Sequence, residues 1–318
     1  MIFLLLFIKA VCGVDLQHTV TYNLTPVTTS RNDQYLCFAH FFDDMDEAYL
    51  RGISISADPR IAHHIATCTC RKPNSDNSIW DCTKMQGNVC QGEAVNFGVW
   101  DHDTESSGHN FLPGDLRVRV GKRTPLKYFV TQVHFRDIVQ GRGLSAANVT
   151  LHLDSKHGSL NYQSYANANE GFIPQKTNKG FFSESACPWM KPPVFVYRYF
   201  VHTHHHGLLV EGFLVRNNTW TLLGSHMSMQ KKSDYYNIIG GPVRIEPGDI
   251  VASRCLFVNT GEEPIKFGMT RRDEMCNFQL DIGYETKYAE SFKRGTVCMK
   301  ESPSFSFCDF VGLSDICK

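Results

Sequence analysis

The chain has 318 residues, 42% hydrophobic and 20% charged, which is the composition of a globular protein with a sizeable core and excludes a disordered one. Lys plus Arg and Asp plus Glu each number 32, so the formal net charge is zero, and the sequence has no long basic run. This balance excludes electrostatic recruitment to nucleic acid or to an acidic membrane surface, and we expect a small molecule or a peptide as the partner.

The N-terminal residues predict a secretory signal at residues 1–13. Residues 1–8 form an apolar run too short to span a bilayer, and small residues follow it near a cleavage point. Lys9 interrupts the run and no basic residue precedes it, so a buried first strand is the alternative. No other stretch of the sequence is long and apolar enough for a membrane span.

Segments rich in β-branched and aromatic residues follow one another along the chain, while helical periodicity is nearly absent. Most of these segments are bounded by Gly, Pro, Asn or Asp. Many short strands with turn signals between them predict an all-β fold of two tandem antiparallel β-sandwiches, similar to jelly rolls. The clearest segments are residues 116–120, 127–134, 149–153, 194–202 and 207–215.

A polar stretch at residues 154–178 predicts the boundary between two domains. We expect few contacts to cross it, although it leaves room for one strand. A chain of this length exceeds the usual single-domain size, and two domains of about 150 residues each are the default. We place the boundary near residue 155, which gives an N-terminal domain at residues 14–155 and a C-terminal domain at residues 156–318.

Twelve cysteines are too many and too dispersed for a typical cytosolic enzyme, and they indicate an oxidising compartment. Glycosylation sequons at Asn23, Asn148 and Asn217 agree with this. We therefore expect a protein that is secreted or held in the lumen of a secretory vesicle, with sugars at these three asparagines.

Residues 201–207 carry four histidines at the end of a strand-like segment. His202 and His204 are two residues apart, so in a strand their side chains leave the same face and can bind one metal ion. His206 shares this parity and His205 points the opposite way, so spacing alone does not decide between two ligands and three. The alternative is a polar stripe on a strand that faces solvent.

His63 and His64 are adjacent, so both can reach one ion only where a strand bends or ends, and a turn signal at residues 58–59 lies just before them. Taken alone, such a pair is more often surface than site, His134 reads as a core histidine, and Met275 reads as core packing. Together these residues and the second histidine run supply imidazole and thioether donors. This donor set suits copper and one-electron redox chemistry, because sulfur beside imidazole favours Cu(I).

Five motifs make the chain resemble the copper type II, ascorbate-dependent monooxygenases, and the peptidylglycine α-hydroxylating members most closely. The motifs stand in the family's order and at compatible spacing, and the resemblance covers residues 33–300. They are Ala62-His63-His64, Gln132-Val133-His134, Val201-His202-Thr203-His204-His205, Thr221-Leu222-Leu223-Gly224 and Asp273-Glu274-Met275-Cys276-Asn277.

The resemblance implies two copper ions on the two sides of an interdomain cleft, with ascorbate as reductant and O2 as co-substrate. One copper stores an electron, and the other, which has the thioether ligand, activates oxygen. The implied reaction is hydroxylation of the α carbon of a C-terminal glycine in peptides, the first step of C-terminal amidation. The implied ligands are His63, His64 and His134 in the N-terminal domain and the catalytic residues His202, His204 and Met275 in the C-terminal domain.

The resemblance also implies four disulfides, since sequence alone does not set their connectivity. Cys68 is left as a buried free thiol, and Cys308 and Cys317 could pair with each other. The chain ends at Lys318 without the lyase domain of bifunctional relatives, so we expect a separate lyase to act on the product. The implied pairs are Cys37 with Cys82, Cys70 with Cys90, Cys187 with Cys298, and Cys255 with Cys276.

The resemblance weakens at the substrate. Where the family holds the substrate carboxylate with an Arg before the His-Thr-His run and a Tyr after the copper Met, this chain has Phe200 and Gln279. Two residues inserted after Arg198 would keep its side chain on the same face of a strand, so Arg198 is a candidate carboxylate clamp. Asn277 matches another substrate position. The alternatives are a dicopper monooxygenase acting on a small amine or phenol, and a secreted copper-binding protein without catalysis.

Overall fold

The computed structural model describes residues 18–85, 88–102, 108–141, 144–227, 233–268, 270 and 272–302. The predicted signal at residues 1–13, Cys308 and Cys317 lie outside these residues. Within them the chain forms 21 strands and two short 3-10 helices, which confirms the predicted all-β fold. No helix in the described part of the chain is long and apolar enough to cross a membrane.

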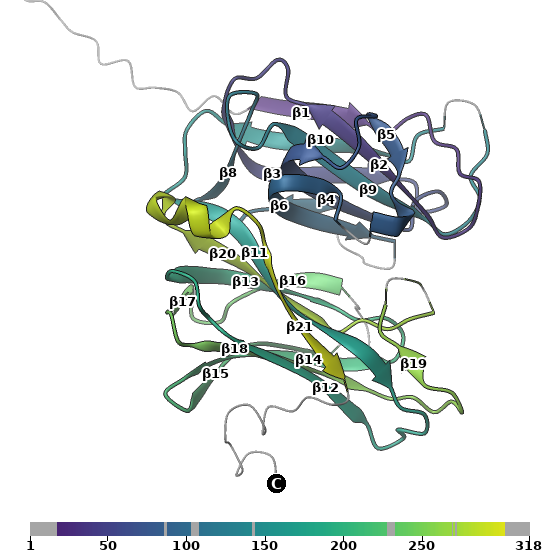
Figure 1. The fold of residues 1–318 in the computed structure, drawn as a ribbon, viewed down its shortest axis with the longest axis vertical. Helices are drawn as coiled ribbons and strands as arrows, with labels where there is room; N and C mark the ends of the chain where they lie inside the picture. Colours follow the sequence, from purple (N-terminus) through teal and green to yellow (C-terminus); the bar gives the residue numbers. More distant parts are fainter. Residues whose placement is uncertain are drawn as a thin grey trace, which may run out of the picture.

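In the N-terminal half, two sheets lie face to face (Figure 1). One sheet has five strands in the order β5-β2-β9-β4-β6, which are β5 Ile79–Asp81, β2 Gln34–Phe41, β9 Tyr128–Phe135, β4 His64–Pro73 and β6 Cys90–Asp101. The facing layer consists of four neighbouring strands of a larger sheet, in the order β1-β10-β3-β8. They are β1 His18–Asn23, β10 Ala147–Asp154, β3 Ala48–Ala57 and β8 Leu116–Val120. The short strand β7 (His109–Phe111) pairs with β3, and the 3-10 helix η1 (Thr83–Met85) follows β5.

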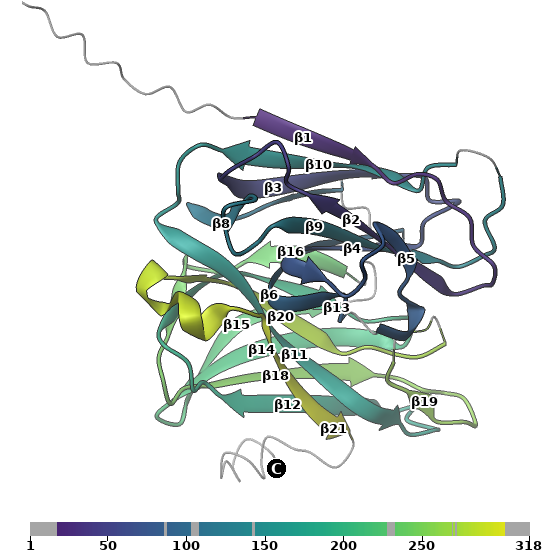
Figure 2. The same cartoon turned by 45° about the horizontal axis from the view of Figure 1, so that its top comes forward.

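The C-terminal half repeats this arrangement of two facing sheets (Figure 2). Its four-stranded sheet has the order β12-β18-β14-β15, which are β12 Phe181–Pro188, β18 Ile250–Phe257, β14 Gly207–Arg216 and β15 Thr219–Met227. Facing it are β11 Leu160–Ile173, β20 Asn277–Tyr284, β13 Val194–His202 and β16 Ser233–Asn237. The remaining elements pair with β13 or β11 or follow β20, and they are β17 Val243–Ile245, β19 Ile265–Lys266, β21 Thr296–Ser302 and the 3-10 helix η2 Thr286–Phe292.

The predicted strands form because their residues alternate between core and surface. In β8, Leu116, Val118 and Val120 are buried while Arg117 and Arg119 point outward. β8 and β13 begin and end at the residues predicted from the sequence, and β9, β10 and β14 differ from their predicted bounds by at most two residues.

One buried cluster gathers the apolar residues of the N-terminal half, from Leu24 to Tyr162, and a second gathers those of the C-terminal half, from Tyr165 to Cys298. The two halves also share backbone pairing, because β8 and β11 are parallel neighbours through Leu160 opposite Leu116. A single sheet therefore continues from one half into the other. The domain boundary near residue 155 stays a prediction.

The polar stretch at residues 154–178 contains the strand for which the sequence left room, and the expectation that few contacts cross between the domains there stays a prediction. Its centre is β11, which pairs with β8, β19, β20 and β21. Its polar residues are buried because their amides bond to the neighbouring strand β12. Asn167 donates to the carbonyl of Ser185 at 3.1 Å, and Asn169 donates to the carbonyl of Glu184 at 2.9 Å.

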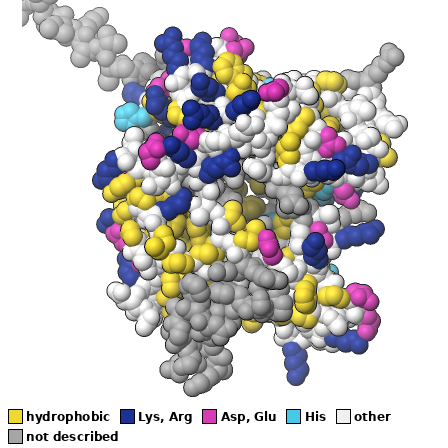
Figure 3. Space-filling model, viewed as in Figure 1, with side chains coloured by type: hydrophobic (Ala, Val, Ile, Leu, Met, Phe, Trp, Pro, Cys, Tyr) yellow, Lys and Arg dark blue, Asp and Glu magenta, His cyan; other side chains and the backbone are white. Residues whose placement is uncertain are grey.

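The structure contains the four disulfides that the resemblance implies. Cys68 is a buried free thiol, as expected, and burial raises its pKa to about 12. Asn23, Asn148 and Asn217 are exposed, and their glycosylation stays a prediction. Basic and acidic side chains are intermixed on the face seen in Figure 3, in line with their equal numbers in the sequence.

Candidate copper centre

Three histidines of the N-terminal half converge at the ends of two neighbouring strands. One ring nitrogen from each of His63, His64 and His134 lies within 4.8 Å of the others. His64 begins β4 and lies directly opposite His134 on β9. The backbone N–H of His63 donates to the carbonyl of His134 at 2.9 Å, which holds the third ring beside the other two.

A turn before β4 lets two adjacent histidines face the same point. The carbonyl of Asp58 accepts bonds from the N–H groups of Ile61 and Ala62, both at 2.9 Å. The strand therefore begins only at His64, and His63 is free of strand alternation. The turn predicted from Asp58 and Pro59 is the local reason that the pair converges.

The environment of His134 directs one of its ring nitrogens at the cluster. Its Nε2 lies 3.2 Å from a carboxylate oxygen of Asp33, while its Nδ1 is buried and has no hydrogen-bond partner. A carboxylate on one nitrogen fixes the tautomer and leaves the lone pair of the other available to a metal. Burial, and then the neighbouring His64 and His63, lower the pKa of His134 to about 4, so the ring is neutral as a ligand must be.

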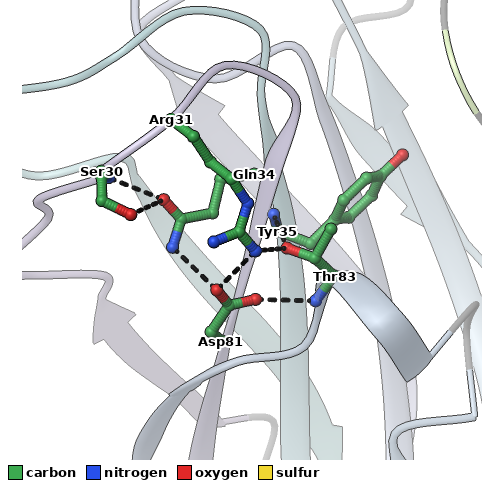
Figure 4. A network of polar contacts seen from close by, with 6 residues as sticks. All are labelled: Ser30, Arg31, Gln34, Tyr35, Asp81 and Thr83. Carbon is green, nitrogen blue, oxygen red and sulfur yellow. Dashed lines mark hydrogen bonds and ion pairs between the residues drawn. The ribbon is translucent and has the colours of Figure 1, made fainter.

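Tyr35 at the start of β2 stacks on the His134 ring, with centroids 4.3 Å apart. A polar network holds this end of β2 in place (Figure 4). Asp81 accepts bonds from Arg31 at 2.7 Å and from Gln34 at 3.1 Å, and the hydroxyl of Thr83 accepts from the N–H of Tyr35 at 2.9 Å. The network therefore fixes the strand that brings Tyr35 and, two residues earlier, Asp33 to His134.

The second set lies in the C-terminal half. His202 is the last residue of β13 and pairs with Asn277, the first residue of β20. The strand ends there, so His204 lies in the connection between β13 and β14. The spacing had predicted instead that His202 and His204 lie on the same face of one strand. The two rings still meet, with centroids 5.0 Å apart. Met275 lies two residues before β20, and its sulfur is 3.5 Å from the amide nitrogen of Asn277.

His204 also presents one orphaned nitrogen. Its Nδ1 lies 2.7 Å from the carbonyl of Asp273, which leaves the lone pair on Nε2, and Nε2 is buried without a hydrogen-bond partner. The Nδ1 of His206 likewise lies 3.1 Å from a carbonyl, that of Val258, but its Nε2 is not a buried nitrogen without a partner. Burial, followed by His204 and His64, lowers the pKa of His202 to about 3, so this ring is neutral as well.

A fully buried carboxylate organises the turn that carries His204. Glu274 accepts bonds from the backbone N–H groups of His204 at 2.9 Å, His206 at 2.7 Å and Met275 at 3.3 Å. The Cys255–Cys276 disulfide then joins the adjacent residue to β18. Both features fix Met275 relative to His204.

The two sets are in direct contact. The rings of His64 and His202 meet edge to face, with centroids 6.2 Å apart. Asp101, buried at the end of β6, lies beside them with one carboxylate oxygen 3.1 Å from the Nε2 of His64. The resemblance implied sites on the two sides of a cleft, whereas the histidines of the two halves touch here.

The candidate substrate residues have other partners. Arg198 is 8% exposed and donates to Asp281, to the side chain of Asn110 and, at 2.9 Å, to the carbonyl of Phe111. It therefore joins β13 to strand β7 of the other half. Its role as a carboxylate clamp stays a prediction. Phe200 and Gln279 lie directly opposite each other on β13 and β20.

Sequence reasoning missed three acidic residues of this centre. Asp33 and Asp101 bond histidines of the first set, and Glu274 holds the turn of the second. Glu274 was seen only as part of a motif. Asp101 carried one signal, because it ends a strand-like segment, but its pairing with His64 depends on strand register, which the sequence leaves open.

Residues 160–305 match the model of the copper type II ascorbate-dependent monooxygenase C-terminal domain. Over this stretch the chain is similar to this family, whose members use copper, ascorbate and O2. It is similar to the relative named "Peptidyl-glycine alpha-amidating monooxygenase B" from Xenopus laevis, with 30% identity over 87% of this chain and 32% of that protein. The relative named "Peptidyl-glycine alpha-amidating monooxygenase" from Mus musculus is 32% identical over 86% of this chain and 28% of its own length.

The chain thus spans about a third of the length of the curated relatives it matches. Among solved structures, "Crystal Structure of the STIV MCP" aligns at 8% identity with a TM-score of 0.33, over 88% of this chain and 99% of that chain. A TM-score this low carries no argument about fold or function.

Proposed function

We propose that this chain is a secreted copper- and ascorbate-dependent monooxygenase that hydroxylates the α carbon of a C-terminal glycine in peptides. The observation that carries the proposal is the contact between two different donor sets in a chain similar to this family. One set offers three imidazoles, and the other offers two imidazoles and a thioether. The similar relatives named amidating monooxygenases indicate the peptide substrate.

The ring nitrogens and the thioether of the two donor sets fit copper by their burial and their chemistry. His134 Nδ1 and His204 Nε2 are buried nitrogens whose other ring nitrogen already has an oxygen partner. A buried polar atom without a partner is costly, and a metal ion removes that cost. Imidazole and thioether together select copper over the hard cations. Bound copper would supply one-electron transfer and dioxygen activation.

The overall reaction balances with ascorbate as the reductant. One oxygen atom of O2 enters the Cα–H bond of the glycine, the other leaves as water, and ascorbate provides two electrons while two protons are taken up. Burial, together with the neighbouring histidines, keeps His134 and His202 neutral. The donors are oriented by Asp33, Glu274 and the carbonyl of Asp273. The product is a hydroxyglycine peptide, which a separate lyase would cleave to the C-terminal amide.

A second candidate keeps the reaction type and changes the substrate to a small amine or phenol. Phe200 and Gln279 lie directly opposite each other on β13 and β20, and neither side chain is charged. The guanidinium of Arg198 is already bonded to Asp281. A substrate carboxylate would therefore need another partner, for which the amide of Asn277 is the nearest candidate, since it lies against Met275.

Substrate profiling distinguishes the two candidates. Copper-loaded protein would be incubated with ascorbate, O2 and a short glycine-extended peptide, with the same peptide as its C-terminal amide and a small phenolic amine in parallel. Oxidation of the free-acid peptide alone supports the proposal. Oxidation of the amine or phenol alone supports the second candidate, and no oxidation of any substrate by protein with two bound coppers identifies a non-catalytic copper protein.

A further inference from the structure

Asp101 is a buried carboxylate at the junction of the two donor sets that the proposed reaction does not use. It is 5% exposed and is the last residue of β6. Strand register places it directly opposite His64, the first residue of β4. Side chains directly opposite in an antiparallel pair leave the same face of the sheet, so the carboxylate and the imidazole project together toward the C-terminal half.

The contact is specific to one ring nitrogen. A carboxylate oxygen of Asp101 lies 3.1 Å from Nε2 of His64. A neutral imidazole that donates its Nε2 proton to this carboxylate has its lone pair on Nδ1. His134 shows the same division, with Nε2 on Asp33 and a buried Nδ1 that has no hydrogen-bond partner. Two of the three rings therefore have a carboxylate on Nε2.

We propose that Asp101 is a positioning residue that orients His64 so that Nδ1 faces copper, and that it does so at the point where His64 touches His202 of the other half. A carboxylate on the far nitrogen makes an imidazole a more basic ligand and fixes its ring orientation. Because His64 meets His202 edge to face, the orientation of one ring constrains the position of the other. By orienting His64, Asp101 therefore affects both the geometry of the three-histidine set and the position of His202 in the second set.

The inference rests on copper occupying the three-histidine set, as proposed above, and its test measures copper binding separately from turnover. Asp101→Asn keeps the size of the side chain and removes its charge. We expect affinity for one of the two coppers to fall about 10- to 100-fold, the usual effect of losing an outer partner of a metal-bound histidine. Asp76→Asn is the matched control, because it removes an exposed carboxylate that is paired with Lys72.

Chelator competition would measure the two affinities, and pulsed EPR of the Cu(II) protein would report the remote nitrogen of the bound imidazoles. The proposal expects a changed remote-nitrogen coupling in Asp101→Asn, an unchanged melting temperature of the metal-free protein, and no further loss of affinity when Asp101→Asn is added to His64→Ala. A residue that acts only on the fold would not change the nitrogen coupling.

Three results would overturn the proposal. The first is wild-type copper affinity and an unchanged EPR spectrum in Asp101→Asn. The second is the same loss of affinity with and without His64, which would make the effect one of general charge. The third is an unfolded metal-free Asp101→Asn protein, which would make Asp101 a structural residue. Wild-type protein that binds two coppers without turnover would count against the proposed function and leave this inference standing.

Discussion

Replacing Arg198 with alanine tests whether its guanidinium stabilises the contact between the two halves or binds the carboxylate of a substrate. The side chain is almost fully buried and its bonds reach Asp281, Asn110 and the carbonyl of Phe111. It also lies over the ring of Tyr235, 4.1 Å from the centroid. Its removal leaves the carboxylate of Asp281, which is 1% exposed, without a charged partner.

Breaking a buried ion pair by removing one partner costs about 3–5 kcal/mol, because the remaining charge stays desolvated. Tyr162 still donates to Asp281 at 2.9 Å, so the lower part of this range is the better expectation, about 3 kcal/mol. Urea unfolding of the metal-free protein would measure the loss. Arg254→Ala is the matched control, because its pair with Glu211 is partly exposed and should contribute about 0–1 kcal/mol.

A double variant separates this mechanism from lost packing. Adding Asp281→Asn to Arg198→Ala removes the unpaired charge and should restore part of the stability. The reasoning is refuted if Arg198→Ala unfolds at the same urea concentration as Arg254→Ala. A normal stability together with a raised KM for free-acid peptides alone would confirm Arg198 as the carboxylate clamp that the sequence predicted.

The remaining predictions concern the donors and their supports. Met275→Leu should keep the fold by circular dichroism but abolish turnover and lower the bound copper measured by metal analysis, because the soft ligand is gone; full activity would show that another residue completes that set. Glu274→Ala should lower the unfolding free energy by about 3–5 kcal/mol, since three partly buried N–H groups lose a charged acceptor, and an unchanged urea midpoint would contradict this. The metal-free protein should become less stable as pH falls below the ordinary histidine value of 6.5, because the pKa of His134 is lowered to about 4 and the unfolded chain binds the proton first. The share of this loss that comes from His134 is about 2 kcal/mol at pH 5, and His134→Gln should remove that share from the difference between the unfolding free energies measured in urea at pH 7 and pH 5. A similar share from His202, whose pKa is lowered to about 3, should remain.

The strands and the disulfides could be predicted because their signals are local or come with the family. Alternating residues such as those of β8 define a strand wherever one face is buried. The polar β11 could not be recognised in this way, because Asn167 and Asn169 are buried through bonds to β12 that no local pattern reveals. Tertiary hydrogen bonding overrode composition there.

The donors themselves stood out in the sequence, but the groups that orient them did not. Asp33 lies 101 residues from His134, and Asp101 lies 37 residues from His64. Only the register of β4 with β6 and β9 brings the rings and Asp101 together. The partners of Arg198 could not be predicted for a related reason. Its face in the strand was argued from parity alone, whereas Asp281 and Asn110 come from a neighbouring strand and from the other half.

The most direct test of the account is the mass of a glycine-extended peptide after incubation with the copper-loaded protein, ascorbate and ¹⁸O2. We predict a product that carries one ¹⁸O atom on the C-terminal glycine and that forms only when both copper and ascorbate are added. The Met275→Leu variant should form none of it. A peptide of unchanged mass, in a sample shown to hold two coppers per chain, would contradict the proposed peptide hydroxylation.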